Sequence, residues 1–178
     1  NSDGEASGST FGLSYVGDSG FVGFSVSNLD NNYGLPPGTH SHGHEEEHDE
    51  DHDEDEDHDE EHEEHGEEEE VDFVRIDLEQ TRYDFKGQLD FDSGFFESLK
   101  ATIGYTDYQH RELEIFEDGE VEVGTLFSNE GTEARFEFVR AQRGDWEGVW
   151  GLQLSDTEFS ALGEEAFIPR SDISNIGL

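Results

Sequence analysis

A stretch rich in histidine and acidic residues, HSHGHEEEHDEDHDEDEDHDEEHEEHGEEEE, occupies residues 40–70 and has the composition of a metal-binding segment. It holds eight of the nine histidines and twenty of the forty-eight acidic residues, and no basic or apolar side chain. Neutral imidazole suits zinc, copper and nickel. Because the chain has no cysteine, no thiolate draws the site towards copper(I) or iron–sulfur chemistry, and zinc is the expected ion.

The spacing of these histidines allows two ways of chelating an ion. A four-residue repeat would place pairs such as His58 and His62 on one face of a helical turn. In an extended chain, alternate residues share one side instead, as in His-Ser-His-Gly-His. Carboxylates fill the remaining coordination positions in either geometry. The candidate ligands of this stretch are His40, His42, His44, His48, His52, His58, His62 and His65.

The charge of the stretch predicts an extended chain that collects cations. Neighbouring carboxylates about 7 Å apart in water repel by about 0.6 kcal/mol, and no Lys or Arg is present to relieve them. We therefore predict a long disordered loop over residues 33–70. Calcium would explain the carboxylates but not the imidazoles, because it takes oxygen ligands, and the glycine and ligand order of an EF-hand are missing. A solvated acidic loop, in which the histidines have no role, is the alternative.

The composition of the whole chain excludes several classes of protein. It has 178 residues, 30% hydrophobic, with a net charge of -39. Outside residues 40–70 there remain 28 acidic and 9 basic groups, a net charge of -19, which argues against nucleic acid as a partner and favours cations. Neither a nucleophile elbow nor a glycine-rich phosphate loop is present, so an enzyme is not expected.

The elements that would carry such a loop are β-strands. In residues 81–91, apolar or small side chains at most odd positions alternate with charged or polar ones at even positions. The same alternation recurs in residues 11–15, 22–26, 99–106, 133–138 and 146–155. No run approaches the roughly 18 apolar residues of a membrane helix, whereas a membrane strand needs only about 9–11 alternating residues.

The connections favour a membrane β-barrel over an ordinary half-buried sheet. Short turns are expected at residues 17–20, 92–94 and 143–145, and long loops at 33–70, 113–122 and 158–170. This alternation is typical of outer-membrane barrels, whose short turns lie in the periplasm. Aromatic residues beside the short turns would form an interface girdle. They are Phe21, Phe91, Phe95, Phe96 and Trp146.

The number of strands predicts an incomplete barrel. We expect about seven antiparallel strands, some of 12 to 20 residues, whereas a bacterial barrel takes an even number. Residues 1–178 are therefore expected to form part of an all-β transmembrane barrel, with the 33–70 loop within it. Such a part has two open edges, and we expect it to aggregate in plain buffer.

Several passages of the sequence resemble a known family. They are NNYGLPPGTHSHGH before the acidic run, VRIDLEQTRYDFKGQLDF, GFFESLKATIGYTDYQHRELE, EVGTLFSNEGTEARFEF and WEGVWGLQLSDTEFSALGEEAFIP. From about Phe11 to Leu178, the chain resembles the β-barrel of TonB-dependent outer-membrane receptors of the zinc-uptake (ZnuD-like) type. The resemblance implies a barrel of about 22 strands, of which this chain would be roughly a third.

The resemblance also implies a location and partners. It implies the bacterial outer membrane, with lipid around the barrel, the His-rich loop outside the cell, and zinc as the transported ion. A plug domain and the TonB complex are implied as further partners, although the sequence contains neither the plug nor the short TonB-contact motif.

Transport needs release as well as capture, so a second site is expected beyond the loop. His110 is its candidate, at the end of a strand that we assign to the outside. Glu112 and Glu114 follow at alternate positions and would share the inner wall with His110, whereas Asp107 would not. A surface histidine at a loop root is the alternative. Glu164 and Glu165 in the last connection are less favoured candidates.

Two other functions stay open. One is a secreted metal-buffering or adhesion protein with a half-buried sheet. The other is a barrel receptor for a siderophore or a cobalamin that carries an incidental acidic loop. Strands that face lipid would distinguish a zinc receptor from the secreted protein. Affinity for metal ions would distinguish it from the siderophore or cobalamin receptor.

Overall fold

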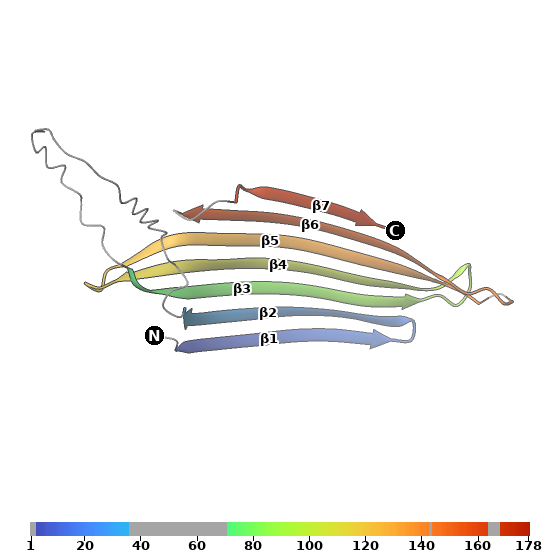
Figure 1. Ribbon diagram of the computed structural model, residues 1–178. Helices are drawn as coiled ribbons and strands as arrows, with labels where there is room; N and C mark the ends of the chain where they lie inside the picture. The colour runs from blue at the N-terminus through green and yellow to red at the C-terminus, as the bar shows by residue number, and fades with distance from the viewer. Residues whose placement is uncertain (1–2, 36–70, 143, 164–167) are drawn as a thin grey trace, which may run out of the picture.

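The computed structural model describes residues 3–35, 71–142, 144–163 and 168–178, and within them the chain forms seven strands and no helix (Figure 1). No helix of the described part is long and apolar enough to cross a membrane. The strands are β1 Gly4–Gly17, β2 Gly20–Gly34, β3 Val71–Asp90, β4 Phe96–Phe116, β5 Val121–Arg140, β6 Val149–Gly163 and β7 Ser171–Gly177.

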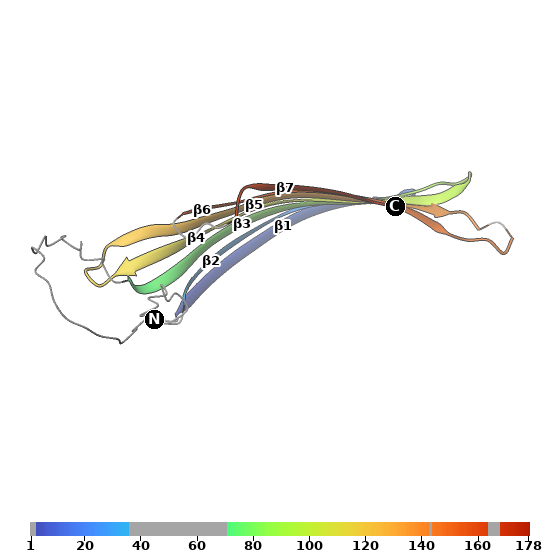
Figure 2. The same ribbon diagram turned by 45° about the horizontal axis from the view of Figure 1, so that its top comes forward.

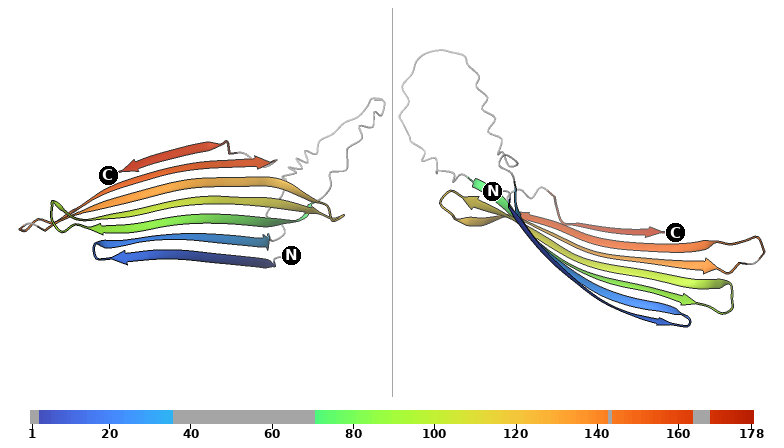
Figure 3. Two further views of the ribbon diagram at one scale, coloured as in Figure 1. Left: turned by 180° about the vertical axis from the view of Figure 1, so that it is seen from behind. Right: turned by 90° about the horizontal axis from the view of Figure 1, so that it is seen from below.

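The seven strands form one antiparallel sheet in which every strand pairs with its neighbours in sequence. The predictions of an all-β fold and of about seven strands are confirmed. The sheet is open within the described residues, because β1 and β7 pair on one side only. It is twisted and bent along the strands (Figures 2 and 3). Residues 18–19, 91–95 and 141–148 connect the strands at one end of the sheet, which we call the hairpin end. We call the opposite end of the strands the loop end.

The connections differ from the predicted alternation of short and long links. The prediction of a long loop at 113–122 is wrong, because β4 and β5 continue to a tight turn. In this turn the Phe116 amide donates to the Glu120 carbonyl at 3.0 Å. Gly119 has a φ of 89° there, a conformation that glycine adopts without strain. The turn forms because the alternating residues on both sides of it extend the strand pairing. At the other loop, Tyr33 and Gly34 belong to β2 rather than to the predicted 33–70 loop.

The register aligns one apolar row across all seven strands on one face. We name the two sides of the sheet the Tyr83 face and the Arg82 face, after consecutive residues of β3. Directly opposite residues of antiparallel strands lie on the same face. One row on the Tyr83 face runs across the whole sheet through Leu13, Phe24, Phe85, Ile103, Ala134, Leu154 and Ile176. No second layer of the described residues covers these side chains, and Leu13 is 73% exposed.

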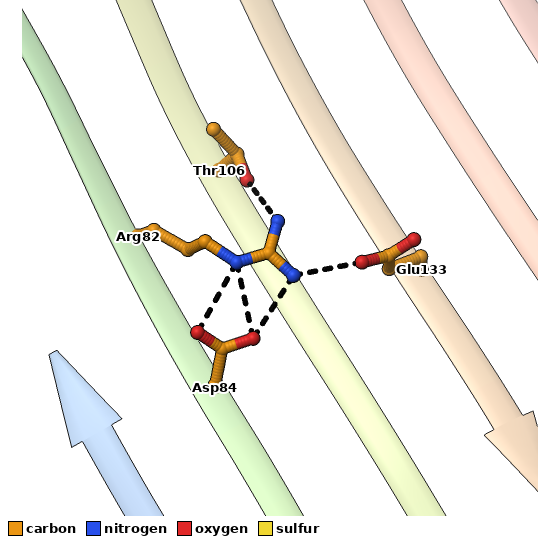
Figure 4. A network of polar contacts seen from close by, with 4 residues as sticks. All are labelled: Arg82, Asp84, Thr106 and Glu133. Atoms are coloured by element: carbon orange, nitrogen blue, oxygen red, sulfur yellow. Dashed lines mark hydrogen bonds and ion pairs between the residues drawn. The ribbon is translucent and has the colours of Figure 1, made fainter. Parts of the chain in front are cut away.

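The Arg82 face carries a polar network at the same level. The Arg82 guanidinium donates to Asp84 at 3.1 Å, to Thr106 Oγ1 at 3.0 Å and to Glu133 at 2.8 Å (Figure 4). It therefore joins β3, β4 and β5. A Cβ on Gly104 would lie 2.8 Å from Arg82 Nη2, so the bare backbone of β4 leaves room for the guanidinium to cross.

Towards the loop end the two faces exchange character. On the Tyr83 face, Arg75 donates to Asn32 at 2.6 Å and Arg111 donates to Asp77 at 2.7 Å. On the Arg82 face, the buried apolar side chains Val74, Ile76 and Ala161 lie at this end. The sheet therefore has an apolar region on each face, and the two regions occupy opposite ends of the strands.

Candidate functional site at the loop end of the Arg82 face

His110 lies on β4 inside the apolar region of the Arg82 face. It stands opposite Leu78 of β3 and Phe127 of β5. The imidazole stacks on the Phe127 ring, with centroids 4.4 Å apart and planes inclined by 20°. Phe127 in turn contacts Phe159 of β6 at 6.3 Å. Stacking on Phe127 thus orients the plane of the histidine ring, and Phe159 on the neighbouring strand β6 supports Phe127.

A hydrogen bond fixes the rotation of the same ring. His110 Nδ1 and the Tyr108 hydroxyl lie 2.9 Å apart, on the same face of β4 two residues apart. Since Nδ1 is occupied, Nε2 is the ring nitrogen left for a metal ion. A metal-bound histidine typically uses its second nitrogen in such a bond, which sets its tautomer and orientation.

Burial lowers the pKa of His110, and the nearby Glu112 carboxylate opposes this shift by a smaller amount. Burial also raises the pKa of the Tyr108 phenol, with a smaller contribution of the same sign from Tyr33. Both shifts favour the uncharged groups. A neutral imidazole is the form that binds a metal ion, so His110 is in its binding form at neutral pH.

Both predicted partners of His110 lie on its face, but only Glu112 lies near the imidazole. The register places Glu112 opposite Ile76 and Glu114 opposite Val74, both on the Arg82 face as predicted. Beyond Glu112, however, the β4–β5 register shifts at a bulge. The Glu114 carboxylate there lies over Gly124, where a Cβ would clash with it. Asp107 lies on the opposite face, opposite Thr81 and Glu130, also as predicted.

No three His, Asp or Glu side chains gather to hold a metal ion in residues 3–35, 71–142, 144–163 and 168–178. His110 and Glu112 therefore supply two candidate donors rather than a complete site. The eight loop histidines lie outside the described residues, and so do Glu164 and Glu165 and the predicted disorder of the loop. Those candidate residues are His40, His42, His44, His48, His52, His58, His62, His65, Glu164 and Glu165.

Strand pairing positions the two described residues that flank the 36–70 segment, Leu35 and Val71. The Leu35 amide donates to the Val74 carbonyl at 2.9 Å, so the chain enters the 36–70 segment from beside the start of β3. Val74 and Leu78 lie on the same face of β3, and Leu78 stands directly opposite His110. The described residues that flank the 36–70 segment therefore lie at the same end of the sheet as His110.

Sequence reasoning missed four residues of this region. Tyr108 could have been found, since it precedes His110 by two positions on an alternating strand. Phe127 could not, because its place beside His110 depends on the β4–β5 register. Two further residues of β5 on this face, Thr125 and Asn129, each have a buried side-chain oxygen without a hydrogen-bond partner in the described part, and Thr125 is only 1% exposed.

No protein-family model matches the chain.

Proposed function

We propose that the sheet is part of the wall of a transmembrane β-barrel, a TonB-dependent outer-membrane receptor that takes up zinc. In this proposal the acidic stretch 40–70 captures zinc outside the cell, and His110 receives the ion on the inner wall. The observation that carries the membrane part is the apolar row across all seven strands on the Tyr83 face, with charged residues behind it on the Arg82 face.

The apolar band on the Tyr83 face has a height that suits a bilayer. On β4 the band extends over ten residues, from Tyr105 to Phe96 at the hairpin end. Ten residues rising about 3.4 Å each span about 34 Å along the strand. At the 35–45° tilt of barrel strands this corresponds to about 26 Å along the membrane normal, against about 25 Å for the lipid-facing band of such proteins.

Aromatic side chains lie at the hairpin-end margin of this band, where an interface girdle is expected. Phe96 contacts Phe95 at 5.0 Å, Phe138 at 5.3 Å and Trp150 at 6.4 Å between ring centroids. The Arg140 guanidinium lies 5.1 Å from the centre of the Phe95 ring. Aromatic rings with a cation beside them suit the boundary between hydrocarbon and headgroups.

The zinc part of the proposal is supported by two different kinds of ligand environment. The eight histidines and twenty carboxylates of residues 40–70 offer many exchangeable donors. His110 instead offers one imidazole held in place by Tyr108 and Phe127. A dense set of weak sites raises the local zinc concentration, and an oriented donor on the inner wall takes the ion onward.

A zinc titration of the whole chain, folded into detergent or lipid, tests this function. The wild type is compared with a variant in which the eight loop histidines become asparagine, and with His110→Ala. The titration is run against a competing fluorescent indicator in millimolar calcium and magnesium. We expect several zinc ions to bind at about pH 7.4 and to be lost at about pH 5.5, where histidine with an ordinary pKa of about 6.5 is protonated.

The variants separate the two ligand environments. Loss of most of the bound zinc in the loop variant, and loss of about one ion in His110→Ala, would support both steps. A control variant with Glu67 to Glu70 changed to glutamine keeps every histidine, so it should retain zinc binding at pH 7.4. Zinc binding that is lost in the glutamine variant but kept in the asparagine variant, or zinc binding no tighter than calcium binding, would refute the zinc function.

The row of rings favours a second candidate, a barrel receptor for an aromatic organic ligand. Tyr108, His110, Phe127 and Phe159 form a continuous series of rings on the Arg82 face. Aromatic surfaces stack on planar ligands, and the described residues hold no complete metal site. Zinc binding that is unaffected by His110→Ala would favour this candidate for the inner wall.

A further inference from the structure

A hollow lies on the Tyr83 face at the hairpin end, beside the turn between β1 and β2. Its volume is about 590 Å³ and its lining is largely apolar. The small residues Gly87 and Ala101, which are opposite each other in the β3–β4 register, lie in its floor. Tyr15, Phe85 and Leu99 are among its walls.

The hollow exists because small and large residues alternate along β3 and β4. Phe85 and Ile103 fill the row above, and Leu89 and Leu99 fill the row below, whereas Gly87 and Ala101 put no large side chain into the intervening row on β3 and β4. The Phe85 ring leans over Gly87, where a Cβ would lie 3.6 Å from ring atoms. A long flexible hydrocarbon chain suits a shallow apolar space of this shape better than a rigid ligand does.

One margin of the hollow is polar and carries negative charge. The turn contributes Asp18 and Ser19 to the lining, and the Tyr15 hydroxyl lies near Gly17 at the end of β1. The lining contains no Lys, Arg or His. An anionic headgroup would be repelled by the Asp18 carboxylate, whereas an ammonium group would be attracted by it.

We propose that this hollow binds one phospholipid of the membrane, with an acyl chain over Gly87 and Ala101 and an ammonium headgroup, as in phosphatidylethanolamine, against Asp18. This inference rests on the membrane part of the proposed function, because only a Tyr83 face in contact with lipid brings an acyl chain to the hollow. It is independent of zinc. The site would lie at the boundary with the headgroups, where the short β1–β2 turn ends the apolar band.

Two alanines on the same face provide a matched test. Ala101→Leu fills the hollow, whereas Ala134→Leu adds the same side chain to a half-buried position outside its lining. The whole chain is reconstituted in bilayers containing phosphatidylethanolamine and phosphatidylglycerol with identical acyl chains. The lipids retained after transfer to detergent are counted by native mass spectrometry. Each methylene displaced from the hollow should weaken retention about fourfold, so Ala101→Leu should lose the lipid and Ala134→Leu should keep it.

A second pair of variants tests the headgroup. Asp18→Asn should abolish the preference for phosphatidylethanolamine over phosphatidylglycerol while an acyl chain is still retained. Asp145→Asn, in the β5–β6 connection, should leave the preference unchanged. Gly87→Ala replaces Ala101→Leu if the latter does not fold, since its added methyl group meets no heavy atom closer than 3.4 Å.

Each result decides between the two proposals. Flotation with the bilayers is measured on every sample. A chain that does not float overturns the membrane assignment and the lipid site together. A chain that floats but retains the same lipids in Ala101→Leu, Gly87→Ala and Ala134→Leu overturns the lipid site alone.

Discussion

The hairpin half and the loop half of this sheet use the same strands in opposite ways. In the hairpin half, Phe85 and its row make the Tyr83 face apolar, and the Arg82 network makes the other face polar. In the loop half, Arg75 and Arg111 place charge on the Tyr83 face, and the other face buries Ile76. The proposed barrel accounts for this exchange, because lipid would contact the Tyr83 face in the hairpin half and water would contact it in the loop half.

On β4, β5 and β6 the first carboxylates of the Tyr83 face lie in two adjacent rows. On the Tyr83 face, the row through Tyr83 and Tyr105 is followed by one with Asp107, Glu130 and Glu158. Directly opposite carboxylates repel, so this acidic row costs stability unless water or cations screen it. In the proposed barrel the row would lie just outside the hydrocarbon, where both are available.

A charge placed on the Tyr83 face should distinguish the two halves most strongly. Phe136→Arg in the middle of the apolar band should lower the free energy of unfolding from phospholipid vesicles by about 2–4 kcal/mol. Ser128→Arg, on the same strand and face in the loop half, should lower it by about 0–1 kcal/mol. Denaturant titration of the vesicle-bound protein measures both values. Equal losses would mean that the two halves share one solvent.

Loss of the Arg82 network should have the next largest effect. Arg82→Met leaves Asp84 and Glu133 without their common cation and should cost about 1–2 kcal/mol, a value reduced by partial exposure of all three side chains. Arg135→Met removes a more exposed ion pair with Glu137 and should cost at most about 1 kcal/mol. The same titration compares them. A larger loss in Arg135→Met would contradict the assigned role of Arg82.

Two tyrosines of β4 on opposite faces test the orientation of His110. Tyr108→Phe removes the hydrogen bond to Nδ1 and should weaken zinc binding at His110 about tenfold. Tyr105→Phe removes a 3.3 Å bond to Glu130 on the other face and should leave zinc binding unchanged. If His110→Ala reduces binding but Tyr108→Phe does not, the ring is held by Phe127 stacking alone.

The pH dependence of His110 should be the smallest of these effects. Since burial lowers its pKa, the imidazole should titrate below 6.5 by NMR. A comparison of the wild type with Tyr108→Phe measures how much the hydrogen bond contributes to this pKa. As the pH falls below about 6.5, His110 becomes protonated in the unfolded chain before it does so in the folded chain. Its contribution to stability is therefore present above about pH 6.5 and is lost as the pH falls towards the lower pKa of the folded state. His110→Gln should remove this part of the acid sensitivity. A midpoint above 6.5 would contradict the burial of the ring.

The sequence was sufficient to predict the strands and their apolar face in the hairpin half. The period-two alternation in residues 81–91 is a local property, and the register keeps it on one face in neighbouring strands. The same reasoning failed at residues 113–122, where it predicts a long loop. There the β4–β5 pairing extends both strands to the turn at Gly119, and such pairing is not visible from either segment alone.

For the candidate site, the sequence determined which donors exist, and the tertiary structure determined which of them meet. The histidines and carboxylates of residues 40–70, and the shared face of His110 and Glu112, follow from composition and alternation. The stacking of His110 on Phe127, its burial, and the turning of Glu114 towards Gly124 depend on the β4–β5 register and its bulge. Register joins residues distant in sequence, so only the folded sheet decides these contacts.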